Sequence, residues 1–172
     1  SILILLLIGA VSGSWMISGV VPTMIFYGMK VIYPEIFLFA TCIISALIAV
    51  MTGSSWTTIA TVGVALVGIG TAQGYEPGWI AGAIISGAYF GDKVSPLSDT
   101  TVLASSTAGT PLFTHIRFMM VTTVPSFLIT LIIFLIVSLI HESPNAAQVA
   151  DISNDLKNSF NISPWLLLVP VI

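Results

Sequence analysis

The chain has 172 residues, 56% of them hydrophobic and only 6% charged, with a formal net charge of −3. A soluble domain carries about a quarter charged residues, so this composition excludes an ordinary soluble fold and indicates a membrane protein. The four basic residues form no stripe that could neutralise phosphates, which excludes a nucleic-acid partner. We therefore expect membrane lipid around a bundle of transmembrane helices.

The first predicted element is a helix over residues 1–30, in which residues 1–27 exceed the roughly 20 residues that a bilayer requires. Pro22 is expected to kink it, because proline removes a backbone hydrogen bond. The run lacks the charged leader and cleavage site of a signal peptide. The chain starts without Met and both ends are apolar. We therefore expect an internal piece of a longer protein, whose remainder would complete the site.

The next predicted element is a re-entrant helical hairpin over residues 36–72. Two apolar runs, 36–51 and 59–71, are each shorter than a full span, and a polar segment separates them. Non-helical backbone at membrane depth is tolerated only inside protein or beside a wet cavity. The hydroxyl and carbonyl oxygens at the tip are hard ligands that suit a small cation. The alternative is that these hydroxyls only bond to their own helix. The candidate ligands are Thr52, Gly53, Ser54 and Ser55.

A broken helix is predicted over residues 78–108. Its centre, residues 91–101 (GDKVSPLSDTT), concentrates charge and hydroxyls in an apolar chain. Pro96 disfavours helix at Ser95, and a second half-helix can restart with Ser95 as its N-cap. Secondary transporters build midplane sites from such breaks. The candidate ion or substrate ligands here are Asp92, Lys93, Ser95, Ser98, Asp99, Thr100 and Thr101.

Asp99 and Asp92 are the candidate ligands for a transported Na⁺. A carboxylate in a low-dielectric cavity can hold either a proton or a small cation, and this competition is sufficient for exchange. Asp99 is expected to be the titrating ligand, while Lys93 pairs with Asp92 or releases it when the cation arrives. The alternative is that Asp92 and Lys93 form a buried pair that only holds the break together. No resident cofactor is expected.

The remaining elements are a helix over residues 116–140, a polar connector over 141–161 and the start of another helix over 162–172. Four basic residues give too small a bias to decide the membrane orientation. A membrane-embedded Ser-His-Asp hydrolase is the other class considered. The chain lacks the Gly-x-Ser-x-Gly turn of such a site, so we expect no enzyme.

The central motif, together with residues 108–110 (AGT), 112–117 (LFTHIR), 52–56 (TGSSW) and 22–25 (PTMI), closely resembles the NhaC family of Na⁺/H⁺ antiporters. This resemblance implies a fold of two inverted repeats, each with a re-entrant hairpin and a broken helix, of which this piece supplies one. It implies exchange of Na⁺ or Li⁺ for H⁺ across a bacterial plasma membrane, and it leaves a homodimer open.

Some members of the family that this chain resembles exchange malate for lactate, and others exchange amino acids. A coupled antiporter of organic anions or amino acids is therefore the alternative function. Lys93 could attract a carboxylate substrate, as could the start of the second half-helix. The motif contains no arginine to hold a carboxylate with two hydrogen bonds, which favours inorganic cations.

Overall fold

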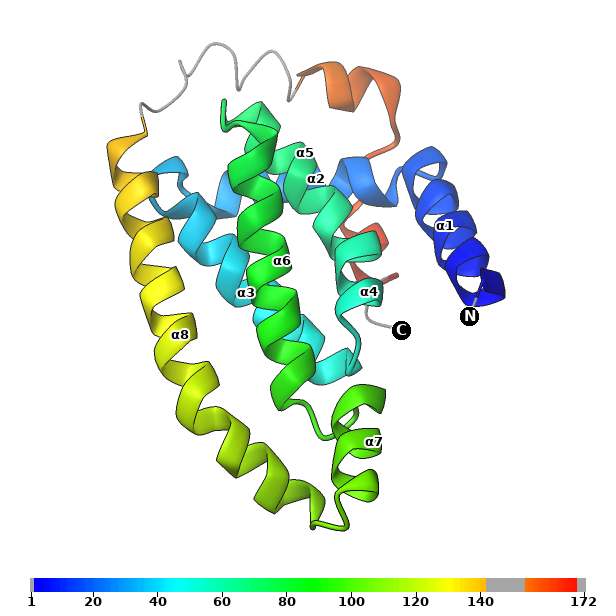
Figure 1. The fold of residues 1–172 in the computed structure, drawn as a ribbon. Coiled ribbons are helices and arrows are strands. Elements are labelled where there is room, and N and C mark those ends of the chain that lie inside the picture. The colour runs from blue at the N-terminus through cyan, green and yellow to red at the C-terminus, as the bar shows by residue number, and fades with distance from the viewer. Residues whose placement is uncertain (1, 142–153, 170–172) are drawn as a thin grey trace.

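The computed structural model of the chain describes residues 2–141 and 154–169. Within these ranges the chain forms helices joined by short turns and contains no strand (Figure 1). Three helical segments are long and apolar enough to cross a bilayer, namely Pro34–Thr52, Ser55–Ala72 and Leu112–Ile140. The described part of the chain is therefore all-α, with the apolar helices of an integral membrane protein, as the composition predicts.

Two helices, α1 (Ile2–Ile17) and α2 (Val20–Val31), stand where the sequence predicts one helix over residues 1–30. They are bent by 72° relative to each other. The bend occurs at Gly19, whose φ of 85° lies in the left-handed region that glycine adopts most readily. Pro22 has no N–H for the carbonyl of Ser18, which lies at this bend, so the interruption expected from Pro22 occurs four residues before it.

A helical hairpin follows, with arms that are longer than the sequence predicts. The first arm is the 3₁₀ turn η1 (Pro34–Ile36) and helix α3 (Phe37–Thr52), 19 residues together. The second arm has 18 residues. It consists of α4 (Ser55–Thr58), the π-helical segment η2 (Ile59–Gly63) and α5 (Val64–Ala72). At 1.5 Å per residue each arm measures about 27–29 Å, close to the thickness of a bilayer core.

Helix α6 (Pro77–Val94) packs along α3 more extensively than any other pair of described helices. Glycines permit this approach, because a Cβ added at Gly87 would collide with the carbonyl oxygen of Cys42. A Cβ at Gly91 would collide in the same way with the carbonyl oxygen of Ala46. Small residues allow membrane helices to approach closely in this manner. The two helices run in the same direction, and their contact places the end of α6 beside the tip of the hairpin (Figure 1).

Two further helices complete the bundle. Helix α7 (Asp99–Thr107) follows α6 after a short non-helical segment, and α8 (Leu112–Ile140) returns along the outside of α3 and α6 (Figure 1). Helix α8 begins four residues before the predicted helix 116–140. Of the predicted connector, residues 142–153 lie outside the described residues and residues 154–159 are helical. Of residues 162–172, the described part forms a 3₁₀ turn, η3 (Pro164–Leu168).

A buried hydroxyl cluster joins α8 to the start of α3 and to the loop before α6. The Tyr75 hydroxyl donates to the carbonyl of Pro34 over 2.8 Å and lies 2.9 Å from Ser138 Oγ, which in turn accepts from the backbone N–H of Leu38. Burial raises the pKa of the Tyr75 phenol above its ordinary value; the bond with Ser138 opposes this shift and the charge of Glu35 adds to it. This end of the bundle is therefore held by polar contacts.

Candidate functional site

The chain breaks its helical path between α6 and α7, over residues 95–98. Ser95 and Ser98 both have extended backbone, with ψ near 130°. Pro96 explains the break, because its ring disfavours helical geometry at the preceding residue and it has no N–H to donate. The restart differs from the prediction: Ser98, not Ser95, occupies the N-cap position of the second helix, and α6 remains helical through Asp92 and Lys93.

The hairpin tip is a tight turn that requires glycine. Gly53 ends α3 with a φ of 68°, and its N–H donates to the carbonyl of Ala49. Ser54 then caps α4, because its hydroxyl accepts a hydrogen bond from the N–H of Thr57 over 3.2 Å. A Cβ added at Gly53 would lie 2.6 Å from the carbonyl carbon of Leu97 in the helix break. The tip and the break are therefore in direct contact.

Two serine hydroxyls connect the hairpin to the helix break. Ser55 Oγ donates to Asp92 Oδ2 over 2.9 Å, which joins the first residue of α4 to the carboxylate near the end of α6. Ser95 Oγ donates to the carbonyl of Val50 over 2.7 Å and accepts from the N–H of Leu97 over 3.1 Å. Ser55 and Ser95 are 2% and 0% exposed, so both serine side chains are buried at this contact.

The start of α7 closes over the end of α6. Thr101 Oγ1 lies 3.5 Å from the carbonyl of Asp92 and 3.4 Å from that of Lys93 and can donate its single proton to either. The Asp92 carbonyl also accepts from the N–H of Ser95. Ser98 Oγ and Thr100 Oγ1 lie 2.9 Å apart. These contacts hold the first turn of α7 against the end of α6, next to the residue whose carboxylate accepts from Ser55.

The two aspartates have different surroundings. Asp92 is half-buried at the hairpin contact, whereas Asp99 is exposed in the first turn of α7. Within residues 2–141 and 154–169 no hydrogen bond or ion pair joins Asp99 to the hairpin tip. The assignment of Asp99 as the titrating ligand therefore stays a prediction, and the geometry favours Asp92 as the carboxylate at this contact.

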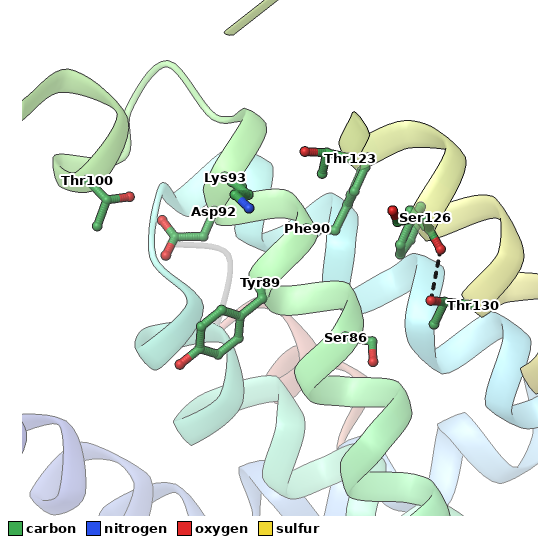
Figure 2. A pocket seen from close by; sticks show the side chains of 10 residues that line it. Ser86, Tyr89, Phe90, Asp92, Lys93, Thr100, Thr123, Ser126 and Thr130 are labelled. Atoms are coloured by element: carbon green, nitrogen blue, oxygen red, sulfur yellow. Dashed lines mark hydrogen bonds between the residues drawn. The ribbon is translucent and has the colours of Figure 1, made fainter. Parts of the chain in front are cut away.

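Lys93 points away from the Asp92 carboxylate, and within the described residues the two side chains form no ion pair (Figure 2). Its ammonium instead faces a groove of about 440 Å³ between α6, α7 and α8. The groove is lined by Ser86, Tyr89, Phe90, Asp92, Lys93, Thr100, Thr123, Ser126, Phe127 and Thr130. Asp92 thus lies between two environments, the serines of the hairpin contact and this partly polar groove.

Sequence reasoning missed the hydroxyl side chains that α8 contributes to the groove. Thr123, Ser126 and Thr130 follow the i, i+3, i+7 spacing of one helix face and point toward α6. That spacing was visible in the sequence as a polar stripe in an apolar helix. Of the predicted hairpin ligands, Gly53 and Ser55 contact the break, whereas Thr52 and Ser54 bond within the hairpin.

An apolar helical bundle with a carboxylate and an ammonium beside an interrupted helix is an arrangement that recurs in membrane transport proteins. The sequence profile of the Na⁺/H⁺ antiporter family matches residues 1–110 and 87–172. The chain belongs to this Na⁺/H⁺ antiporter family, which confirms the resemblance drawn from its central motif. No solved structure matches the chain significantly.

Curated relatives share this sequence at high identity. The chain is 46% identical over 171 residues to the Na⁺/H⁺ antiporter NhaC of Alkalihalophilus pseudofirmus, covering 99% of this chain and 37% of that protein. It is 44% identical over 174 residues to the malate-2H⁺/Na⁺-lactate antiporter of Bacillus subtilis, covering 100% and 37%. It is 38% identical over 176 residues to the arginine/ornithine antiporter ArcD of Halobacterium salinarum, covering 100% and 36%. The chain thus spans little more than a third of these relatives.

Proposed function

We propose that the protein containing this chain is a secondary active transporter that exchanges Na⁺ or Li⁺ for H⁺. The observation that carries the proposal is the hydrogen bond from Ser55 Oγ to Asp92 Oδ2, which joins the hairpin tip to the helix break at a carboxylate. Membership of the Na⁺/H⁺ antiporter family supports the same activity. The high identity to two NhaC antiporters, at 46% and 41%, supports the choice of cation.

Competition between a proton and a cation at Asp92 would couple the two fluxes. When Asp92 is protonated it is neutral, which suits a site surrounded by apolar helices. When it is ionised, its oxygens and the hydroxyl oxygen of Ser55 can both turn to a small cation, because a hydroxyl has two lone pairs besides its proton. Asp99 lies in the first turn of α7, after the non-helical residues 95–98. It would supply a second carboxylate if α7 moved toward the hairpin tip.

The same proposal includes a re-entrant hairpin, a broken helix α6–α7 and one repeat of an inverted-repeat transporter. Both hairpin arms have the length of a full span, so length alone does not support a re-entrant path. The position of the tip supports it. Helix α8, at 29 residues, measures about 43 Å. The end of α8 that follows α7 extends past the turn between α3 and α4 (Figure 1), which supports a tip that lies part-way along the longest membrane helix.

A coupled exchanger of organic anions or amino acids is the second candidate, and the groove at Lys93 favours it. An ammonium that faces a cavity of about 440 Å³ lined by hydroxyls can bind a small carboxylate. The relatives named for malate, lactate, arginine and ornithine share 44% and 38% identity with this chain. The Bacillus relatives support a location in a bacterial plasma membrane.

The test is a transport assay on the full-length protein in everted membrane vesicles with an imposed pH gradient. We expect NaCl or LiCl to release the proton gradient in the absence of any organic solute, and KCl to release it much less. A response that requires malate, lactate or an amino acid would replace cation exchange with the second candidate. The absence of any response to all of these solutes would overturn both.

A further inference from the structure

Two of the four basic side chains of the chain meet at one aromatic ring, away from the helix break. Lys30 Nζ lies 4.4 Å from the centre of the Phe26 ring, and Lys157 Nζ lies 5.2 Å from it. Lys30 is in the last turn of α2, whereas Lys157 comes from the described helical residues 154–159. Tertiary structure therefore brings together two like charges that are far apart in the sequence.

These lysines line a pocket to which the described part of the chain contributes no acidic side chain. The pocket measures about 540 Å³, and its polar lining includes Tyr27 and Asn161 besides the two ammoniums. Among the described residues neither ammonium forms an ion pair. A cation beside an aromatic ring gains only about 0.5–1 kcal/mol at an exposed site, and two cations on one ring repel each other. An anion bound between them would remove this repulsion.

The pocket lies at the polar end of the bundle. The described residues 154–159 are at the same end of the molecule as the start of α6 (Figure 1), and Tyr33, three residues beyond Lys30, is 71% exposed. Tyrosine at a helix end is typical of the membrane–water interface. Lipid phosphates occupy that level, and basic pockets beside transmembrane helices bind the headgroups of anionic lipids.

We propose that the pocket formed by Lys30, Lys157 and Asn161 binds a phosphate group, carried there by the headgroup of an anionic lipid. Both lysine stems are flexible, so both ammoniums can contact one phosphate beside the Phe26 ring. The amide of Asn161 and the hydroxyl of Tyr27 supply further donors of the kind that phosphate oxygens accept. The site is separate from Asp92 and does not depend on the proposed cation exchange.

The experiment measures lipid and phosphate binding to the full-length protein, with no ion gradient. The protein is placed in nanodiscs of neutral phosphatidylcholine, phosphatidylglycerol is titrated in, and bound lipid is counted by native mass spectrometry. Inorganic ³²P-phosphate binding is measured in parallel. Each lysine near a membrane surface contributes a factor of about five to anionic lipid binding, so the double variant Lys30→Gln/Lys157→Gln should bind phosphatidylglycerol about thirtyfold more weakly.

Two controls make the result specific. Arg117→Gln removes an exposed cation in the first part of α8, outside this pocket, and should leave the saturable binding of phosphate unchanged. Lys30→Arg/Lys157→Arg keeps both charges and should retain binding. If the double glutamine variant does not fold, the single variants Lys30→Gln and Lys157→Gln replace it, each with an expected loss of about fivefold. Saturable binding of inorganic phosphate without phosphatidylglycerol binding would retain the site but assign it to a soluble anion. Equal lipid binding by wild type and the glutamine variant, or no binding of either probe, would overturn the proposal.

Discussion

The contact between the hairpin tip and the helix break can be tested at Gly53. Alanine at this position would have to adopt a φ of 68°, which costs a residue with a Cβ about 1–2 kcal/mol. The new Cβ would also lie 2.6 Å from the carbonyl carbon of Leu97. Relieving such a collision typically costs a further 1–3 kcal/mol. Gly53→Ala should therefore lower the free energy of unfolding by about 2–5 kcal/mol.

Substitutions at two other glycines separate the backbone cost from the steric cost in this loss of unfolding free energy. Gly109 has a φ of 64° but nothing within 4 Å of an added Cβ, so Gly109→Ala isolates the backbone cost of about 1–2 kcal/mol. Gly78, in the first turn of α6, has neither constraint, so Gly78→Ala should stay within about 1 kcal/mol of wild type. The difference between Gly53→Ala and Gly109→Ala therefore measures the contact with Leu97.

The assay is thermal and denaturant unfolding of the full-length protein in detergent. Unfolding is monitored by the chemical labelling of Cys42, which is fully buried in the folded state. Sodium-driven proton flux in vesicles is measured on the same variants. We expect Gly53→Ala to lose flux as well as stability, because the turn positions Ser55 against Asp92. If Gly53→Ala is no less stable than Gly109→Ala, the tip does not contact the break and the proposed site is wrong.

Three further predictions follow from the same contacts. Asp92→Asn should abolish sodium-driven proton flux, whereas Asp99→Asn should retain part of it; the reverse order in a vesicle assay would make Asp99 the essential carboxylate. Gly87→Ala should lower the free energy of unfolding by at least about 1–3 kcal/mol, because the added methyl collides with the backbone of α3; wild-type stability would contradict the close packing. Tyr75→Phe should cost about 1–3 kcal/mol, because the Pro34 carbonyl loses its donor. Burial raises the pKa of Tyr75 in the folded state, so wild type should lose stability as the pH rises above about 10, and the phenylalanine variant should show no such step in unfolding curves.

Rules that act on single residues and short segments predicted the helices and the helix break, but they placed several helix boundaries incorrectly. The hydropathy of the chain predicted membrane helices, and the sterics of Pro96 predicted an interruption near Asp92. The same rule applied to Pro22 predicted a kink, and the chain bends by 72° three to four residues before that proline. The rule did not predict the turn at Gly19, whose φ of 85° separates α1 from α2. The restart of α7 also moved, from Ser95 to Ser98.

The sequence by itself determined the class of the protein and the existence of a charged helix break, because the cost of charge in lipid and the sterics of proline act on individual residues. Only the tertiary structure decided which carboxylate meets the hairpin. The close packing of α3 against Gly87 and Gly91 sets the rotation of α6, which turns Asp92 toward Ser55 and Lys93 toward the groove. The rotation of α6 depends on contacts between residues about 45 positions apart in the sequence. A local sequence pattern cannot predict such contacts.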